Sequence, residues 1–312
     1  MPRTLLRYVL QTSWPHQLGL VALTSAVFLI EVVPLELQRR VVNDLVKHRS
    51  YGAIVILCGV YAAAVIAQGG IKLVANIYRG WIGERALRDL RRQVYARMRP
   101  SVAMQRLGTA QGTAAAMIVA EVEPIGGFVG SAVAEPLLQA GILASVVAYI
   151  VHLDPWMAFA ALALFVPQLV FVPIMQHSMN RRVGTRVWIL RQIGAGVIGA
   201  KPTGPENARE AEDEHRIKRV FQLDIGIFKL KFTMNFLMNL CSHMQVIAVL
   251  LLGGWLVHIG QIEVGAVVAC ISSVGRLSDP WGDLLNYFRE ISLSRVKYEL
   301  LVEAMETAEE AA

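Results

Sequence analysis

Long stretches of apolar residues are the feature that most constrains how this chain can fold. A helix that crosses a bilayer needs about 20 consecutive, mostly apolar residues, and six stretches approach or exceed that length. Only 17% of the 312 residues are charged, against roughly 25% in a soluble domain. These values exclude a soluble enzyme, a disordered chain and a small disulfide scaffold. We therefore predict an all-α polytopic membrane protein whose six transmembrane helices run approximately over Leu18–Leu35, Ala53–Ile71, Val129–Val151, Trp156–Met175, Phe236–Ile259 and Ile262–Leu277.

The distribution of basic residues predicts the orientation in the membrane. With the N-terminus inside, only Arg39, Arg40, Lys47 and Arg49 lie on the outer side, and the other 26 of the 30 lysines and arginines lie on the inner side. Cytoplasmic loops of membrane proteins carry such an excess. Both termini are therefore predicted to be cytoplasmic, in a plasma membrane or a bacterial inner membrane. The net charge of +6 is explained in this way, so membrane lipid is the expected partner and nucleic acid is not.

Two inner segments, Lys72–Phe128 and Gln176–Asn235, carry apolar residues at helical spacing, which is not typical of linkers. Because a helix rises 1.5 Å per residue, thirty such residues project roughly 45 Å. We therefore expect four spans to continue as long helices into the cytoplasm, paired across two sharp turns. Residues 1–16 are expected to form a short helix in the membrane interface, followed by the six-span domain at 17–300 and an acidic tail at 301–312.

Polar residues inside spans are candidates for a substrate pathway, because each is costly in hydrocarbon. Glu31 in the first span either contacts a cation or substrate, or pairs with Arg39 or Arg40. Gln68 in the second span is a candidate for the same reason. Glu135, at the start of the third span, is expected to reach cytoplasmic water.

The fifth span opens with Asn235, Asn239 and His243, which share one helical face because they are spaced by four residues. Together with Gln245 they either face a water-filled cavity or form hydrogen bonds between packed helices. No second ligand stands at a suitable spacing from His243, and the three cysteines of the chain are far apart in the sequence. We therefore predict no metal site and no catalytic residues.

Six spans, an interfacial N-terminal helix and two long helical inner loops together resemble the transmembrane domain of ATP-binding-cassette (ABC) exporters. In that family the first inner loop carries a glycine and, after a short coupling helix, an acidic residue; the segment RLGTAQGTAAAMIVAEVEPI supplies Gly112 and Glu121. The second inner loop carries a glycine, a lysine and a glutamate five residues apart; GVIGAKPTGPE supplies Gly196, Lys201 and Glu206. The resemblance implies that these five residues contact an ATPase domain.

The nucleotide-binding domain that powers this family is not found in the sequence. The closest match to a phosphate-binding loop, Gly194–Gly199, is followed by Ala200 where a lysine is required. The segment after Arg295 is too short for an ATPase domain. We therefore expect no cofactor on this chain, and ATP and Mg²⁺ on a separate ABC ATPase subunit or on a domain removed from this chain.

The resulting prediction is the membrane subunit of an ATP-driven exporter, forming the substrate pathway as a homodimer or as a heterodimer with a related chain. One alternative is an uncoupled membrane scaffold or assembly protein; Pro202 and Pro205 favour it, because they disfavour a continuous coupling helix. The other is an ATP-independent channel or secondary transporter. It would place broken spans or paired ionisable residues near the membrane midplane, and the sequence offers little of either beyond Glu31.

Overall fold

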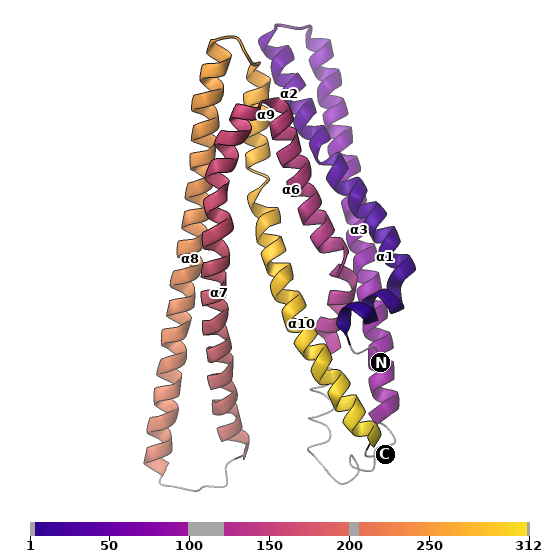
Figure 1. Cartoon of the computed structure of the whole chain (residues 1–312), viewed down its shortest axis with the longest axis vertical. Helices are drawn as coiled ribbons and strands as arrows, with labels where there is room; N and C mark the ends of the chain where they lie inside the picture. Colours follow the sequence, from indigo (N-terminus) through magenta and orange to yellow (C-terminus); the bar gives the residue numbers. More distant parts are fainter. Residues whose placement is uncertain (1–3, 99–121, 200–205, 311–312) are drawn as a thin grey trace. The chain divides into compact units, whose positions relative to one another are not determined.

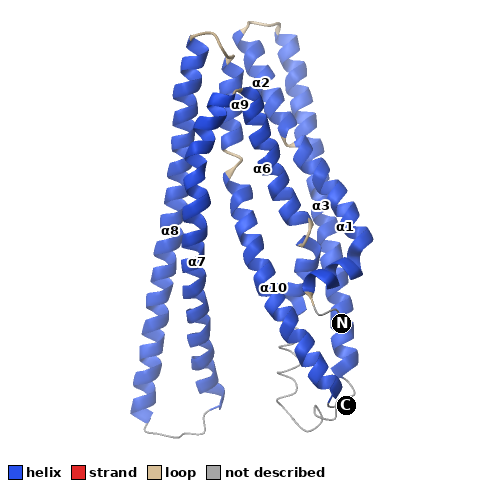
Figure 2. Cartoon of the chain, in the orientation of Figure 1, coloured by secondary structure: helices blue, strands red, loops and turns tan. Residues whose placement is uncertain are grey.

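The computed structural model of the chain describes residues 4–98, 122–199 and 206–310. Every regular element in these ranges is a helix (Figure 2), which confirms the predicted all-α fold. The longest helices, α3 (Tyr51–Met98), α7 (Pro155–Gly199) and α8 (Glu206–His258), contain 48, 45 and 53 residues. At 1.5 Å per residue they are about 65–80 Å long, whereas the hydrocarbon core of a bilayer is about 30 Å thick. Each therefore continues far beyond a single membrane crossing.

Within the described residues, five helical segments are long and apolar enough to cross a membrane, judged by length and composition. The sixth predicted stretch, 262–277, contains a shorter helix: α9 (Val264–Val274) has 11 residues, and a turn at 275–277 separates it from α10 (Ser278–Glu310). The five segments are Leu5–Val46, Tyr51–Ala96, Ala134–Leu153, Pro155–Leu190 and Glu212–His258.

The chain forms two compact units. The first consists of Met1–Pro155 and Leu256–Ala312 and therefore contains α1 (Leu5–Ile30), α2 (Val32–Val46), α3, α6 (Ala134–Leu153), α9 and α10. The second, Trp156–Trp255, consists of most of α7 and α8. In the first unit α2 packs along α9, α1 packs against α3 and α6, and α10 packs against α6 and α3 (Figure 1).

Three helix interruptions in the first unit each lie just before a proline. Glu31 separates α1 from α2, three residues before Pro34; a turn at 132–133 separates a helix at 122–131 from α6, whose first turn contains Pro136; and the turn at 275–277 precedes Pro280 in α10. Proline is tolerated in the first turn of a helix, but its ring clashes with the carbonyl group four residues earlier. A new helix can therefore begin at each proline, while the preceding helix cannot continue through it.

The carbonyl group that Pro136 frees finds a partner on another helix. Because Pro136 has no N–H, the carbonyl oxygen of Ala132 has no α-helical donor. It accepts a hydrogen bond of 2.7 Å from the hydroxyl group of Tyr287 on α10. This contact fixes the interruption before α6 against α10, within the buried core of the unit.

The N-terminal segment is set apart from the rest of α1 by a kink. Ser13 has non-helical backbone angles (φ −134°, ψ 15°), and Pro15 follows it. Leu5, Tyr8 and Val9, before the kink, are buried, whereas Leu6, Leu10 and Trp14 form an exposed apolar stripe at a spacing of four residues that ends just after the kink. The segment is thus attached to the protein by one face and presents an apolar face outward, which is the pattern of a helix that lies in the membrane interface.

The core of the first unit lies between the N-terminal segment, α3, the helix at 122–131 and α10. Tyr298 is fully buried, and its ring lies 5.6 Å from that of Tyr8. Leu301 and Val302 are also buried in this cluster, and α10 continues to Glu310. The packed bundle therefore extends past residue 300, where the sequence analysis placed the start of an acidic tail. Other large members of the core are Ile82, Leu87, Leu90, Val94, Ile125, Phe128 and Val129.

The second unit is a pair of long helices. An ion pair of 2.9 Å between Arg186 Nε and Asp224 Oδ1 joins α7 to α8. The side chain of Arg182 occupies the position where a Cβ atom on Gly226 would lie, so the arginine uses the space that the glycine leaves. Many large apolar side chains of both helices are exposed, among them Phe159, Ile174, Phe236 and Leu251.

Candidate functional site

A charged pocket of about 420 Å³ opens among the interrupted helices of the first unit. Its walls come from the α1–α2 interruption, from α3, from the first turns of α6, and from the α9–α10 interruption. Four carboxylates and three basic side chains line it, which is exceptional for a bundle with this apolar composition. These residues are Glu31, Glu135, Asp279 and Asp283, and Lys72, Arg79 and Arg276.

Glu31 lies at one side of the charged pocket and binds groups from two other helices. One carboxylate oxygen pairs with Arg276 Nη1, and the other accepts a hydrogen bond from Gln68 Nε2 on α3. The predicted pairing of Glu31 with Arg39 or Arg40 is wrong, because both of these arginines bind Glu36 instead. The structure thus brings the two predicted candidates Glu31 and Gln68 together, and adds Arg276, which the sequence analysis did not single out.

A second polar chain crosses the charged pocket from α3 to α10. Arg79 pairs with Glu135, whose other oxygen accepts a hydrogen bond of 2.9 Å from Gln139 Nε2. The same nitrogen donates to Asp283 Oδ2 at 3.0 Å. Burial, followed by the nearby carboxylates of Glu135 and Asp279, raises the pKa of Asp283. Glu135, expected only to reach water, is therefore a member of a network that joins three helices.

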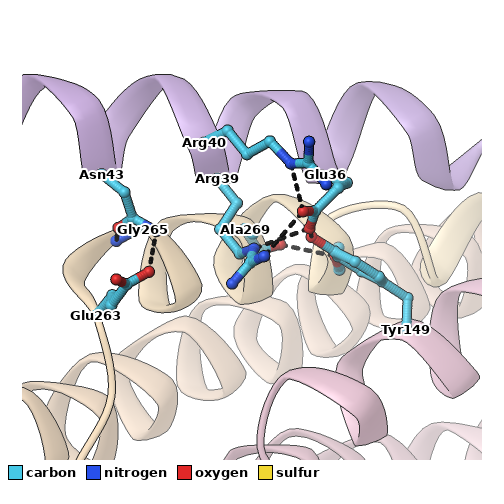
Figure 3. Close-up of polar contacts among 9 residues, drawn as sticks. Glu36, Arg39, Arg40, Asn43, Tyr149, Glu263, Gly265 and Ala269 are labelled. Atoms are coloured by element: carbon cyan, nitrogen blue, oxygen red, sulfur yellow. Dashed lines mark hydrogen bonds and ion pairs between the residues drawn. The ribbon is translucent and has the colours of Figure 1, made fainter. Parts of the chain in front are cut away.

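A further polar network joins α2 to α6 and α9 (Figure 3). Glu36 accepts hydrogen bonds of 2.8 Å from Arg39 and Arg40 on its own helix, and one of 3.1 Å from the hydroxyl group of Tyr149 on α6. Each oxygen of Glu36 therefore binds an arginine, and the carboxylate is fully satisfied although only a quarter of its side chain is exposed.

The contact between α2 and α9 requires a glycine. Gly265 donates its backbone N–H to Asn43 Oδ1 at 2.8 Å, which satisfies one of the unpaired N–H groups in the first turn of α9. A Cβ atom at this position would clash with the carbonyl oxygen of Arg39 and with Asn43 Oδ1. Asn43 also donates to Glu263, which pairs with Lys47. The hydrogen bond from Lys47 lowers the pKa of Glu263.

Most of the residues predicted to couple to an ATPase lie outside the described residues. Gly112, Glu121 and Lys201 fall in the ranges 99–121 and 200–205. Gly196 belongs to the last turn of α7, and Glu206 is the first residue of α8. The range 200–205 therefore lies between the long helices α7 and α8, and the range 99–121 follows the long helix α3.

The polar residues predicted along the fifth span lie on α8 in the second unit. Asn235, Asn239 and His243 are all exposed, as expected for residues that share one face of a helix. Gln245 is fully buried and its amide makes no hydrogen bond to the described residues, and the same holds for Gln168 on α7. In the part of the chain that the structure describes, no group of three or more His, Cys, Asp or Glu side chains could hold a metal ion.

The helical spans, the helices that exceed the bilayer and the charged pocket define a multi-pass membrane protein of the transporter class. The family model of the ABC transporter transmembrane region matches residues 19–183, more than half of the chain. The chain belongs to this family and is the membrane subunit of an ABC-type transporter. Membrane regions of this kind generally form dimers and pair with ATPase domains. No curated protein matches the chain.

Proposed function

We propose that this chain is the membrane subunit of an ATP-driven exporter, that it forms the substrate pathway as a dimer, and that ATPase domains drive it through its two inner loops. The observation that carries the proposal is the family match over residues 19–183, which covers α2, α3 and α6 and extends into α7. The proposal places both termini in the cytoplasm. In the first unit the basic residues Arg85, Arg88, Arg91 and Arg92 lie on the half of α3 that packs with both chain ends, which supports this orientation.

The long helices support a mechanical coupling. α3 and α7 continue tens of ångströms past one bilayer thickness before the chain reaches residues 99–121 and 200–205. A rigid helix transmits a displacement at its end to the membrane, whereas a flexible loop absorbs it. An ATPase that contacts Gly112–Glu121 and Lys201–Glu206 would therefore move the helices that line the pathway.

The charged pocket and the polar face of α8 are the proposed polar parts of the pathway. Ionisable groups inside membrane bundles are costly and are retained where they contact substrate, ions or one another. The pocket residues come from three helix interruptions and from α3, so their side chains converge on one cavity. Asn235, Asn239 and His243 would face the pathway from α8.

The test is ATP hydrolysis by the complex purified from its source membrane in mild detergent. We expect an ATPase to copurify, and we expect the variant Lys201→Asp/Glu206→Lys to lose most of the hydrolysis that depends on the membrane subunit. Lys47→Asp/Glu263→Lys is the matched control, because it exchanges the charges of another lysine–glutamate pair and should leave hydrolysis unchanged. Absence of any copurifying ATPase, with the full reading frame confirmed, would contradict the proposal.

A second function is favoured by one observation. The interrupted helices and paired ionisable residues of the charged pocket are features of secondary transporters, and the structure provides many more of them than the sequence analysis expected. Proteoliposome transport separates the two functions. Uptake that requires ATP outside the vesicles, where inverted molecules present their ATPase domains, supports the ABC exporter, whereas uptake driven by a proton or sodium gradient without ATP supports the secondary transporter. Transport by neither source of energy would favour an uncoupled scaffold.

A further inference from the structure

The first unit carries a basic, aromatic surface where α3 leaves its apolar segment. We call it the α3 basic surface and define it by Trp81, Glu84, Arg85, Arg88, Arg91, Arg92 and Tyr95. Two hollows indent it. One, of about 540 Å³, is lined by Trp81, Glu84, Arg85 and Arg88; the other, of about 320 Å³, is lined by Glu84, Arg88, Arg91, Arg92 and Tyr95. The four arginines outnumber Glu84 and Asp89, which pairs with Arg88, so this surface keeps a positive balance.

The position of the surface along α3 corresponds to one face of a membrane. No charged residue occurs from Tyr51 to Ile71, and exposed apolar side chains continue to Ile77, which is 64% exposed. Trp81, 49% exposed, is the next large exposed apolar side chain. From Tyr51 to Trp81 the helix rises roughly 45 Å, which equals a bilayer thickness of about 40–45 Å including the headgroups. Tryptophan is enriched at that depth, so Trp81 marks the headgroup layer.

The side chains beyond Trp81 point back toward the membrane. In a helix the Cα–Cβ bonds tilt toward the N-terminus, and on α3 this is the direction of the apolar segment. Arg85 shows the result, because its guanidinium group lies 5.4 Å from the centre of the Trp81 ring, one turn earlier. Arg85 therefore directs its charge to the headgroup layer, although its Cα atom lies beyond it. Arg88 instead pairs with the neighbouring Asp89 at 3.1 Å.

His16 of α1 contacts both Trp81 and Arg85 and fixes their positions. Its Nε2 lies 3.0 Å from Arg85 Nη1, and its Nδ1 lies 2.8 Å from the hydroxyl group of Tyr78. An arginine can only donate, so Nε2 accepts and Nδ1 carries the proton that is donated to Tyr78. The imidazole ring also packs edge-on against Trp81, at 5.2 Å between centroids. Trp81 and Arg85 are thus positioned before any ligand binds.

We propose that the α3 basic surface binds the headgroup of an anionic phospholipid of the inner leaflet. Arginine recognises phosphate oxygens through paired N–H donors, and basic pockets on the cytoplasmic side of membrane bundles suit anionic headgroups. The exposed apolar face of α3 above the surface, ending at Leu73 and Ile77, would contact the acyl chains. This site is separate from the charged pocket, and its occupancy does not depend on ATP coupling.

The experiment is native mass spectrometry of the purified complex after exchange into equal amounts of dioleoyl-phosphatidylglycerol and dioleoyl-phosphatidylcholine. We expect the native protein to retain phosphatidylglycerol preferentially. Arg85→Gln/Arg88→Gln should reduce this preference by at least roughly 5-fold, the effect of one arginine near the membrane surface, and Arg88 contributes less than Arg85 because it pairs with Asp89. Arg289→Gln/Arg295→Gln, which removes two exposed arginines from α10, should leave it unchanged. Equal retention of both lipids by the native protein, or an unchanged preference in the Arg85/Arg88 variant, would overturn the proposal.

A second measurement does not depend on the folding of an arginine variant. Phosphatidylglycerol brominated on its acyl chains should quench tryptophan fluorescence more than brominated phosphatidylcholine does, and this difference should disappear in Trp81→Phe. Soluble glycerol 3-phosphate should not compete, because it lacks the acyl chains that contact α3. Competition by glycerol 3-phosphate would indicate a free-phosphate site and would overturn the assignment to lipid, as would a quenching difference that persists without Trp81.

Discussion

Glu31 and Arg276 form an ion pair across 245 positions of the sequence, and each stands where a helix is interrupted. Glu31 separates α1 from α2, and Arg276 lies in the turn between α9 and α10. The pair therefore ties together two places at which the backbone can bend. In a transporter these are places where a conformational change can concentrate, since interrupted helices have fewer backbone hydrogen bonds to break.

Removing one member of this pair should destabilise the protein. The Glu31 side chain is only 13% exposed and Arg276 34% exposed, so a single charge left in this place is poorly solvated. We expect Arg276→Gln and Glu31→Gln each to lower the free energy of unfolding by about 1–2 kcal/mol. Thermal unfolding in detergent would measure this. In a double-mutant cycle, strictly additive effects would show that the two side chains do not interact.

Gly265→Ala should separate α9 from α2. Its Cβ atom would meet the backbone of Arg39 and the side chain of Asn43, and the hydrogen bond from the Gly265 N–H would lengthen. Overpacking of this kind typically costs about 1–3 kcal/mol, measured as a loss of thermal stability. Gly59→Ala on α3 is the matched control, because a Cβ atom there meets nothing within 4 Å. Equal effects of the two substitutions would refute the close contact.

Tyr287→Phe should leave the freed carbonyl oxygen of Ala132 without its donor. A buried acceptor that loses its hydrogen bond costs about 1–3 kcal/mol, and we expect a decrease of this size in unfolding free energy. The exposed Tyr51→Phe should have almost no effect. Because Pro136 frees the carbonyl group, Tyr287→Phe should cost less in a Pro136→Ala background, where an N–H is restored. An equal cost in both backgrounds would contradict this explanation.

Asp283→Asn should stabilise the protein near neutral pH. The pKa of Asp283 is raised above its ordinary value of 3.8 by burial and by Glu135 and Asp279, with Lys72 and Arg79 opposing the rise. The protonated form is thus favoured in the folded state, so this stabilising contribution is complete below pH 3.8 and is lost as pH rises through the raised pKa. The asparagine keeps an oxygen that can accept from Gln139. Unfolding curves between pH 4 and pH 8 should show the advantage of the variant growing with pH, and a constant difference would rule out this origin.

Part of the charged pocket could be anticipated from single residues. Glu31 and Gln68 stand out because each is a polar residue in an apolar stretch, and the structure joins them directly. Glu135 was noted only as a residue expected to reach water, and Arg276 and Asp283 did not stand out, since each lies at the end of a stretch where a charged residue is ordinary. The signal that could have found them is shared by three segments: a proline in the first turn of a helix, with an acidic residue one to three positions before it.

The sequence by itself determined the class of fold, because apolar length and the distribution of lysine and arginine depend only on local composition. It also marked prolines at which a helix can stop, but α7 continues through Pro167 and Pro173, so proline alone does not decide where a helix ends. The tertiary structure alone decided which of the helix interruptions lie next to one another. The partner of Glu31 is Arg276 rather than the nearer Arg39 or Arg40. Arg39 and Arg40 lie on the same helix as Glu36 and bind it, while the packing of α9 on α2 brings Arg276, in the turn after α9, to the α1–α2 interruption. A charged side chain pairs with the opposite charge that helix packing places beside it. The distance between the two residues along the sequence does not determine the pairing.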